Sequence, residues 1–170
     1  MCEPLILVLT AQPLKTARLT LEPLGVRHAA EMVAVLADPA LYEYIGGEPP
    51  SEADLVARYT RQTSRDDWLN WILREQASRD AVGTVQATLR GSAAELAWVV
   101  STGAQGKGYA TEATAAVIGW LRENDVREFV AHVRPDHAAS RAVAARLGFQ
   151  PTESIKNGEV RWELSTRCHN

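Results

Sequence analysis

The chain has 170 residues, of which 46% are hydrophobic and 23% charged, and its formal net charge is -3. This length and composition suit one domain spanning residues 1–170 that buries a core without crosslinks. The slight acidic excess excludes the broad positive surface of proteins that bind nucleic acids or anionic membranes, so we expect neither as a partner.

The N-terminal segment shows no sign of export or membrane insertion. Residues 5–9 are apolar but too few to cross a bilayer, and no basic segment with a small-residue cleavage site precedes them. Cys2 and Cys168 lie near opposite ends without the spacing of a metal site, which fits free thiols in a reducing compartment. We therefore expect a cytoplasmic protein without a bound metal.

Periodicity predicts one strand and two helices in the first third of the chain. Residues 18–24 alternate with period two and favour a strand, whereas residues 27–37 carry apolar side chains at helical spacing. Ser51 is a good N-cap, and Asp54 three residues later resembles a capping box, so a second helix should run to about Ser64.

The middle of the chain predicts a meander followed by a crossover. Residues 68–74, 82–89 and 95–100 are three apolar strands close in sequence, which favours antiparallel neighbours. A helical stripe covers residues 109–124, and residues 126–133 form the next strand. The unit from Glu95 to Val133 therefore predicts a parallel strand pair joined by a helix.

A short helix and a hairpin should close the fold. Residues 140–147 favour a helix that ends at Gly148, and residues 149–155 and 160–164 flank an Asn-Gly turn. The result is an α/β fold. We expect a central mixed, mostly antiparallel sheet of about six or seven strands, flanked by about four helices.

A glycine-rich loop joins the apolar strand 95–100 to the helix that follows it. Gly103, Gly106 and Gly108 permit positive φ and close approach of a ligand to the backbone. The first N–H groups of a helix lack partners within the helix, and its dipole favours an anion there. Lys107 adds a positive charge. The loop therefore predicts a site for a phosphate or pyrophosphate group.

Neither familiar nucleotide motif fits this loop. A P-loop requires Ser or Thr after Gly-Lys, but Gly108 follows Lys107. A dinucleotide-binding fingerprint requires a third glycine or alanine, and Thr111 occupies that position.

The loop instead resembles that of the GNAT superfamily of N-acetyltransferases. Residues 105–110, Gln-Gly-Lys-Gly-Tyr-Ala, match the family pattern Gln/Arg-x-x-Gly-x-Gly/Ala between a strand and a helix. The later segments 135–140 and 146–149, the second reading Arg-Leu-Gly-Phe, stand at the family's spacing. The opening segment 16–24 looks like the branch that contains the ribosomal-protein N-terminal acetyltransferases.

The resemblance implies a single-domain GNAT-like fold that uses acetyl-CoA as the acyl donor. In the family, loop amides bind the pyrophosphate of coenzyme A, and pantetheine lies along the preceding strand. The implied cofactor-binding residues are Trp98, Val99, Val100, Gln105, Gly106, Lys107, Gly108, Tyr109, Ala110, Thr111, His137 and Ser140. The implied reaction is direct attack of a primary amine, on a protein N-terminus or a small molecule, on the acetyl thioester.

Amide formation from a thioester needs a base for the amine and a proton for the leaving thiolate. His132 and Glu95 are rival candidates for the base, and histidine suits proton transfer near neutral pH. Many relatives place a tyrosine, as the general acid, at the position where this chain has Ala144. Ser140 is therefore the candidate for the general acid in this chain.

Three further residues are of interest: one departs from the family pattern, and two are candidates to bind the acceptor amine. His137 stands where the family usually has asparagine. Tyr42 and Tyr44 lie where the family's acceptor cleft is often walled, so we assign them to substrate binding.

Several alternatives stay open at this stage. A coenzyme A-binding sensor domain without catalysis would carry the same loop, as would a transferase for succinyl or another acyl group. The sequence identifies neither the amine nor the oligomeric state, although relatives are often homodimers. The mild acidity of the chain slightly favours a cationic acceptor.

Overall fold

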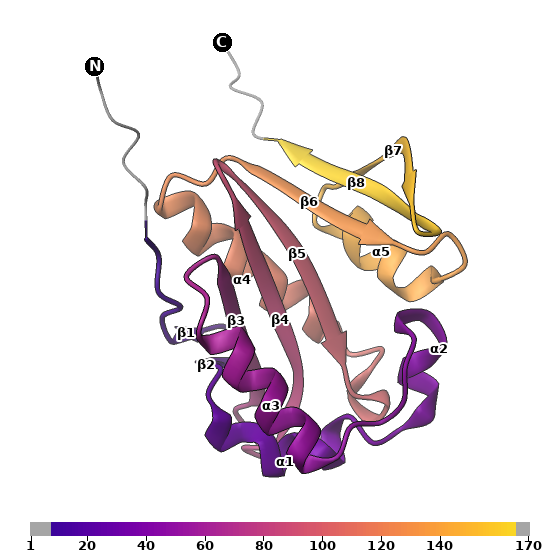
Figure 1. Ribbon diagram of the computed structural model, residues 1–170. Coiled ribbons are helices and arrows are strands. Elements are labelled where there is room, and N and C mark those ends of the chain that lie inside the picture. Colours follow the sequence, from indigo (N-terminus) through magenta and orange to yellow (C-terminus); the bar gives the residue numbers. More distant parts are fainter. Residues whose placement is uncertain (1–7, 166–170) are drawn as a thin grey trace.

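The computed structural model describes residues 8–165, so Cys2, Cys168 and most of the segment 5–9 lie outside it. Within this range the chain forms an eight-stranded sheet with the order β1-β2-β3-β4-β5-β6-β8-β7 (Figure 1). Its strands are β1 (Leu14–Lys15), β2 (Leu19–Pro23), β3 (Trp68–Glu75), β4 (Ala81–Arg90), β5 (Ala93–Val100), β6 (Glu128–Val133), β7 (Gln150–Lys156) and β8 (Glu159–Ser165). The mixed α/β fold expected from the sequence is confirmed, with slightly more strands.

Helices cover both faces of the sheet (Figure 1). They are α1 (Ala29–Val35), α2 (Tyr42–Ile45), α3 (Glu52–Thr63), α4 (Tyr109–Glu123) and α5 (Ala138–Arg146), with 3-10 turns η1 (Val26–His28), η2 (Pro39–Leu41) and η3 (Thr102–Ala104). No helix within residues 8–165 combines the length and apolarity needed to cross a membrane.

The connections follow the sequence patterns. Strands β3, β4 and β5 form the predicted antiparallel meander, and β5 pairs with β6 in parallel across α4. Ser51 caps α3 in the predicted capping box: its hydroxyl accepts from the Asp54 backbone N–H, and its own backbone N–H donates to the Asp54 carboxylate. Asn157 and Gly158 have φ of 54° and 78° and connect β7 to β8, as the primed hairpin turns require. The sequence missed β1 and α2, which are two and four residues long.

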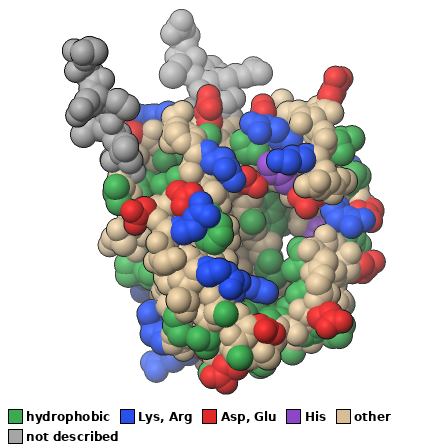
Figure 2. Space-filling view, in the orientation of Figure 1, with side chains coloured by type: hydrophobic (Ala, Val, Ile, Leu, Met, Phe, Trp, Pro, Cys, Tyr) green, Lys and Arg blue, Asp and Glu red, His purple; other side chains and the backbone are tan. Residues whose placement is uncertain are grey.

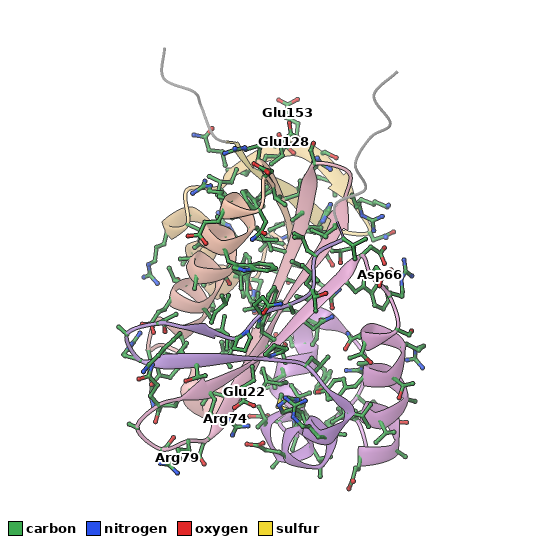
Figure 3. All side chains as sticks on the ribbon, turned by 90° about the vertical axis from the view of Figure 1, so that its left-hand side faces the viewer. Glu22, Asp66, Arg74, Arg79, Glu128 and Glu153 are labelled. Carbon is green, nitrogen blue, oxygen red and sulfur yellow. The ribbon has the colours of Figure 1, made fainter. Side chains whose placement is uncertain are left out.

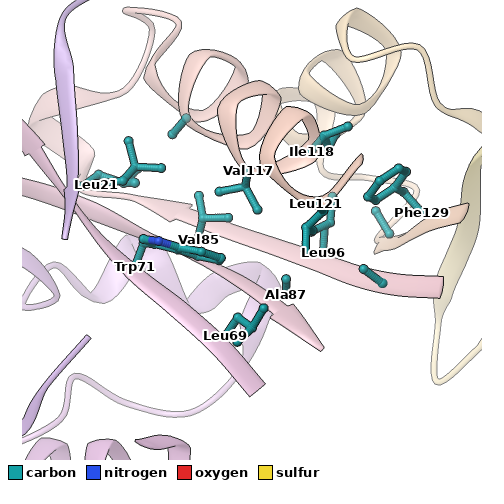
Figure 4. Close-up of a cluster of buried hydrophobic side chains, with 14 of the residues drawn as sticks. Leu21, Leu69, Trp71, Val85, Ala87, Leu96, Val117, Ile118, Leu121 and Phe129 are labelled. Atoms are coloured by element: carbon teal, nitrogen blue, oxygen red, sulfur yellow. The ribbon is translucent and has the colours of Figure 1, made fainter. Parts of the chain in front are cut away.

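The larger core lies between the sheet and α4 (Figure 4). Alternate strand residues such as Trp71, Val85 and Leu96 meet Val117 and Leu121 of the helix, and each of the five is at most 2% exposed. The Trp71 indole donates to the carbonyl oxygen of Gln12 at 2.8 Å, so its polar group is satisfied inside the core. These contacts fix α4, and therefore the loop that precedes it, against β4 and β5.

Charged groups fasten α1 to the other face of the sheet. The guanidinium of Arg74 on β3 lies beside Glu22 of β2 (Figure 3) and contacts Glu31 of α1 at 2.6 Å. Buried His28 contacts a Glu22 carboxylate oxygen at 2.9 Å. The hydrogen bond from Arg74 holds the pKa of Glu22 below its usual range, against the opposing effect of burial.

The sheet opens where β5 and β6 separate. Their parallel pairing runs from Ala93–Glu128 to Leu96–Ala131, whereas β5 stays paired with β4 as far as Gly83–Val100. Beyond Leu96, the β6-facing edge of β5 is therefore unpaired with another strand of the described chain. A strand edge of this kind can bind an extended ligand through its backbone.

Gly83 lets β4 and β5 come close at this point. A Cβ atom built on Gly83 would lie 2.2 Å from the Val99 carbonyl oxygen and 3.0 Å from Val100 Cα. Any side chain here would displace the strand that forms one wall of the opening.

Candidate active site

A cavity of about 590 Å³ occupies the opening between β5 and β6. Figure 2 shows the surface hollowed here, with hydrophobic walls and histidine side chains at its border. Of the residues predicted to bind the cofactor, its wall contains Trp98, Val99, Val100, Gln105, Gly106, Gly108, Tyr109, Ala110, Thr111, His137 and Ser140. We call it the main cavity. Its volume is within the usual range for small-molecule and cofactor sites, about 300–1,000 Å³.

The loop at one end of the main cavity depends on two glycines. Gly106 and Gly108 have φ of 78° and 82°, and Gly108 is the N-cap of α4. The Gln105 side-chain amide donates to the Val100 carbonyl at 3.0 Å and so ties the loop to the end of β5. Gly103 does not take the positive φ that we expected, because it lies in the 3-10 turn η3.

The start of α4 presents polar groups at the main cavity. The backbone N–H groups of Tyr109, Ala110 and Thr111 belong to the first turn, whose amides have no partner within the helix. The Thr111 hydroxyl is buried and has no hydrogen-bond partner among the described residues. These donors, with the positive end of the helix dipole, make an anion site.

The buried side chain of Tyr109 ties the start of α4 to the sheet. The Tyr109 ring lies 4.6 Å from the Arg18 guanidinium carbon and 5.9 Å from Lys107 Nζ, and its hydroxyl donates to Glu75. This bond raises the pKa of Tyr109 and lowers that of Glu75. Lys107 is not part of the cavity wall, so any contact it makes with a ligand comes from the rim.

Glu112 anchors α4 to the N-terminal part of the sheet. Its carboxylate accepts hydrogen bonds from Thr16 Oγ1 at 2.6 Å, from the Arg18 backbone N–H at 3.1 Å and from Arg18 Nε at 2.8 Å. This three-bond anchor was not predicted, because its partners are more than 90 residues apart in the chain.

The two rival bases lie together. His132 Nδ1 is 3.2 Å from Glu95 Oε1, and the other Glu95 oxygen lies 3.5 Å from Arg90 Nε. His132 is part of the main cavity wall, whereas Glu95 is not. The arrangement therefore presents the imidazole to the cavity and places the carboxylate behind it, where it can orient the ring.

His137, and not Ser140, caps α5. The helix begins at Ala138, two residues earlier than expected, and the Ser140 N–H donates to His137 Nδ1 at 3.2 Å. Burial lowers the pKa of His137, so its neutral form can accept this bond at Nδ1 and retain a donor at Nε2. Ala144, at the family's tyrosine position, is fully buried in the core.

The two substrate-binding candidates face different cavities. Tyr44 lies in the wall of the main cavity, where its ring meets His137 edge-on at 4.1 Å. Tyr42 lies in the wall of a smaller neighbouring cavity of about 180 Å³ and donates its hydroxyl to the Leu36 carbonyl at 2.8 Å.

Two arginines of the main cavity wall were not predicted. Arg134 follows β6 and contacts Asp136 at 3.2 Å, and Arg146 ends α5. Arg146 belongs to the segment 146–149, but nothing in its sequence pattern indicates that its side chain borders a cavity.

Residues 18–150 match the model of the acetyltransferase (GNAT) domain family. No curated protein matches the chain closely enough to be counted as a relative. A GNAT-family acetyltransferase structure from Bacillus anthracis is 17% identical, with a TM-score of 0.79 over 91% of this chain and 98% of that one. An acetyltransferase from Agrobacterium tumefaciens is 22% identical, with a TM-score of 0.76 over 94% and 98%.

A third similar structure contains a ligand. It is described as RimL, a ribosomal-protein alpha-N-acetyltransferase, in complex with coenzyme A. It is 19% identical, with a TM-score of 0.79 over 91% of this chain and 98% of that one. At these identities the structural matches establish the fold alone.

Proposed function

Because the chain belongs to the GNAT acetyltransferase family, we propose that it transfers an acetyl group from acetyl-CoA to a primary amine by direct attack. The observation that carries the proposal is the main cavity, which joins an anion-binding helix start to an unpaired strand edge and a histidine. Acyl transfer as such follows from the family. The acetyl group, the amine and the residue roles are our proposal.

The residues of the main cavity fit coenzyme A. The first-turn amides of α4 and the unpartnered Thr111 hydroxyl suit its pyrophosphate, and Arg146 adds positive charge in the wall. The unpaired edge of β5 beyond Leu96 suits the two amides of pantetheine, and His137 Nε2 can donate to one of them. Bound acetyl-CoA supplies an electrophilic thioester carbonyl and a thiolate leaving group.

The chain supplies the proton transfers. His132 takes a proton from the attacking amine, and Glu95 holds the imidazole in place at 3.2 Å. The backbone N–H of Val100 is the candidate to stabilise negative charge on the carbonyl oxygen, because it points away from β4, whereas the N–H groups of Val99 and Ser101 lie on the β4 side of the strand. Ser140 in the cavity wall is the candidate donor to the departing sulfur.

A thermal-shift titration with acetyl-CoA, succinyl-CoA, coenzyme A, ATP and NADPH tests the donor. A specific ligand at one hundred times its Kd adds about 2.7 kcal/mol, which raises the Tm by a few degrees. We expect shifts with the coenzyme A species alone, and faster thiol release from acetyl-CoA than from succinyl-CoA once an amine is present. A larger shift with ATP or NADPH would exclude the proposal. Binding of acetyl-CoA without turnover of any amine would support a sensor domain instead.

A further inference from the structure

The smaller cavity, which we call the second cavity, adjoins the main cavity across β5. Both cavities have Ile45, Ala97, Trp98 and Val99 in their walls. Ala97 and Glu95 alternate along β5, so they lie on the same face of the sheet, and Glu95 contacts His132. A molecule in the second cavity can therefore reach the proposed base and the proposed acetyl donor past Ala97.

Two buried hydrogen-bond donors in the wall of the second cavity have no partner. Tyr59 is 3% exposed, and neither its hydroxyl nor the Asn70 Nδ2 group has a hydrogen bond within residues 8–165. Burial raises the pKa of Tyr59 to about 12, so the hydroxyl stays protonated at neutral pH. Buried donors are rarely left unpaired, because each costs the desolvation of the group. A ligand that accepts hydrogen bonds would satisfy both.

The same wall carries a positive charge and no opposing one. Arg58 of α3 belongs to this wall and forms no hydrogen bond or ion pair within the described part of the chain. Its positive charge acts at longer range on the carboxylate of Asp54, one helical turn earlier. The charge of Arg58 also interacts electrostatically with the hydroxyl groups of Tyr59 and Tyr42. None of the described wall residues is an aspartate or a glutamate. The cavity therefore favours an anionic group and disfavours a polyamine.

We propose that the second cavity binds the carboxylate of a free amino acid, with Arg58, Tyr59 and Asn70 as its partners, and directs the amine toward His132. This inference rests on the proposed function. At about 180 Å³ the cavity falls below the range of about 300–1,000 Å³ usual for drug-sized ligands, which suits a single amino acid and not a longer peptide. An N–C bond forms to the acetyl carbon as the C–S bond breaks. One amine proton leaves to His132, and the thiolate takes a proton, which gives an N-acetylated amino acid and coenzyme A.

Thiol release from acetyl-CoA tests this assignment. The acceptors are the common L-amino acids, their α-carboxamides and the matching decarboxylated amines, with spermidine and a tripeptide added. We expect kcat/KM for at least one free amino acid to exceed that for its amide and its amine by tenfold or more. Arg58→Gln should raise KM for the acid at least tenfold and bring the ratio of acid to amide close to one. Arg61→Gln removes the same charge from an exposed position of the same helix outside the cavity, so the ratio should stay within twofold of the native value.

Tyr59→Phe separates a binding role from a structural one. Removing an unpartnered hydroxyl should leave the Tm unchanged or higher while KM for the acid rises. A lower Tm with an unchanged KM would show that the hydroxyl is structural and would overturn its assignment.

Calorimetry with acetyl-CoA distinguishes the failure of this inference from failure of the proposed function. If acetyl-CoA binds but only amides, amines, spermidine or the tripeptide react, the proposed function stands and the carboxylate assignment is wrong. If acetyl-CoA binds and nothing on the panel reacts, the carboxylate assignment is again wrong. If acetyl-CoA does not bind, the proposed function fails, and this inference fails with it.

Discussion

The two cavities that meet at β5 are walled by different kinds of groups. The proposed cofactor site of the main cavity is formed mostly by backbone, from a loop with two left-handed glycines, the first turn of a helix and an unpaired strand edge, and side chains such as His132 and His137 line the rest of this cavity. The second cavity uses side chains, from α3 and from strands β3 and β4. A site formed by backbone amides depends on the path of the backbone, and many different side chains are compatible with that path. A wall of side-chain donors depends on the identity of each residue.

The largest effect should come from the proposed base, which lines the main cavity and not the second. His132→Gln removes the proposed base but leaves the loop intact, so we expect kcat to fall by about 10²–10⁴-fold. The Kd for acetyl-CoA, measured by calorimetry, should stay within about twofold of the native value. Glu95→Gln should cause a smaller fall in kcat, because its carboxylate lies behind the imidazole. A His132→Gln variant with native kcat would show that another group or a water chain removes the proton.

Gly83 tests whether the backbone wall depends on strand spacing. Gly83→Ala would place Cβ 2.2 Å from the Val99 carbonyl oxygen, so β5 must move, and overpacking of this kind costs about 1–3 kcal/mol. The free energy of unfolding, measured with urea, should fall by that amount, and acetyl-CoA affinity should fall with it.

Gly119→Ala is the matched control for this substitution. Gly119 lies in the middle of α4 with open space around its Cβ position, so alanine should stabilise the protein by about 0.5–1 kcal/mol. If both alanines have the same effect, the close approach of β4 to β5 is of no energetic consequence.

Gly108 tests the loop itself. Its φ of 82° lies in the left-handed region, where an L-residue costs about 1–2 kcal/mol. We expect Gly108→Ala to weaken acetyl-CoA binding by about 5–30-fold, the equivalent of that energy, while KM for the acceptor changes little. Equal changes in the Kd for acetyl-CoA and in the KM for the acceptor would mean that the two cavities do not bind their ligands independently.

The smallest effect should come from Glu22, which lines neither cavity. Because Arg74 lowers the pKa of Glu22, the ionised carboxylate stabilises the fold above about pH 5, and this contribution is lost as pH falls through the lowered pKa. Glu22→Gln should therefore cost about 1 kcal/mol at pH 7. Urea unfolding of both proteins between pH 3 and pH 7 should show their curves converging at the acid end. A constant difference across that range would assign the effect to packing.

The contrast between the cavities also explains which parts of the site the sequence could reveal. The loop 105–111 is contiguous, and its glycine spacing before an apolar helix has a local meaning. Tyr59 and Asn70, by comparison, read as an ordinary core tyrosine and a polar strand residue. Their place beside the main cavity depends on strand register. Asn70 of β3 pairs with Gln86 of β4, and Gln86 pairs with Ala97 of β5 at the edge of the main cavity.

Register likewise decided the relation between His132 and Glu95. As separate candidates they were rivals, because periodicity fixes the face of a strand but not its offset from a neighbour. The parallel pairing of Glu95 with Val130 brings the carboxylate beside the imidazole two residues farther along β6. The fold itself was predictable because most of its elements are long and strongly patterned. The exceptions, β1 and α2, are two and four residues long, about one period each, and a single period does not establish a repeating pattern.

The Glu112 anchor has a consequence for the order in which the molecule acquires structure. Its carboxylate is 94 to 96 residues away in sequence from Thr16 and Arg18, so the loop becomes rigid only after a large part of the chain has been brought together. Opening of the segment between β1 and β2, which carries Thr16 and Arg18, would release the start of α4 while Leu19 and Leu21 of β2 stay in the core. In native-state hydrogen exchange, the amide of Glu112, which donates to the Gly108 carbonyl, would then exchange together with those of Thr16 and Leu19, which hold that segment, although no strand pairing joins it to α4.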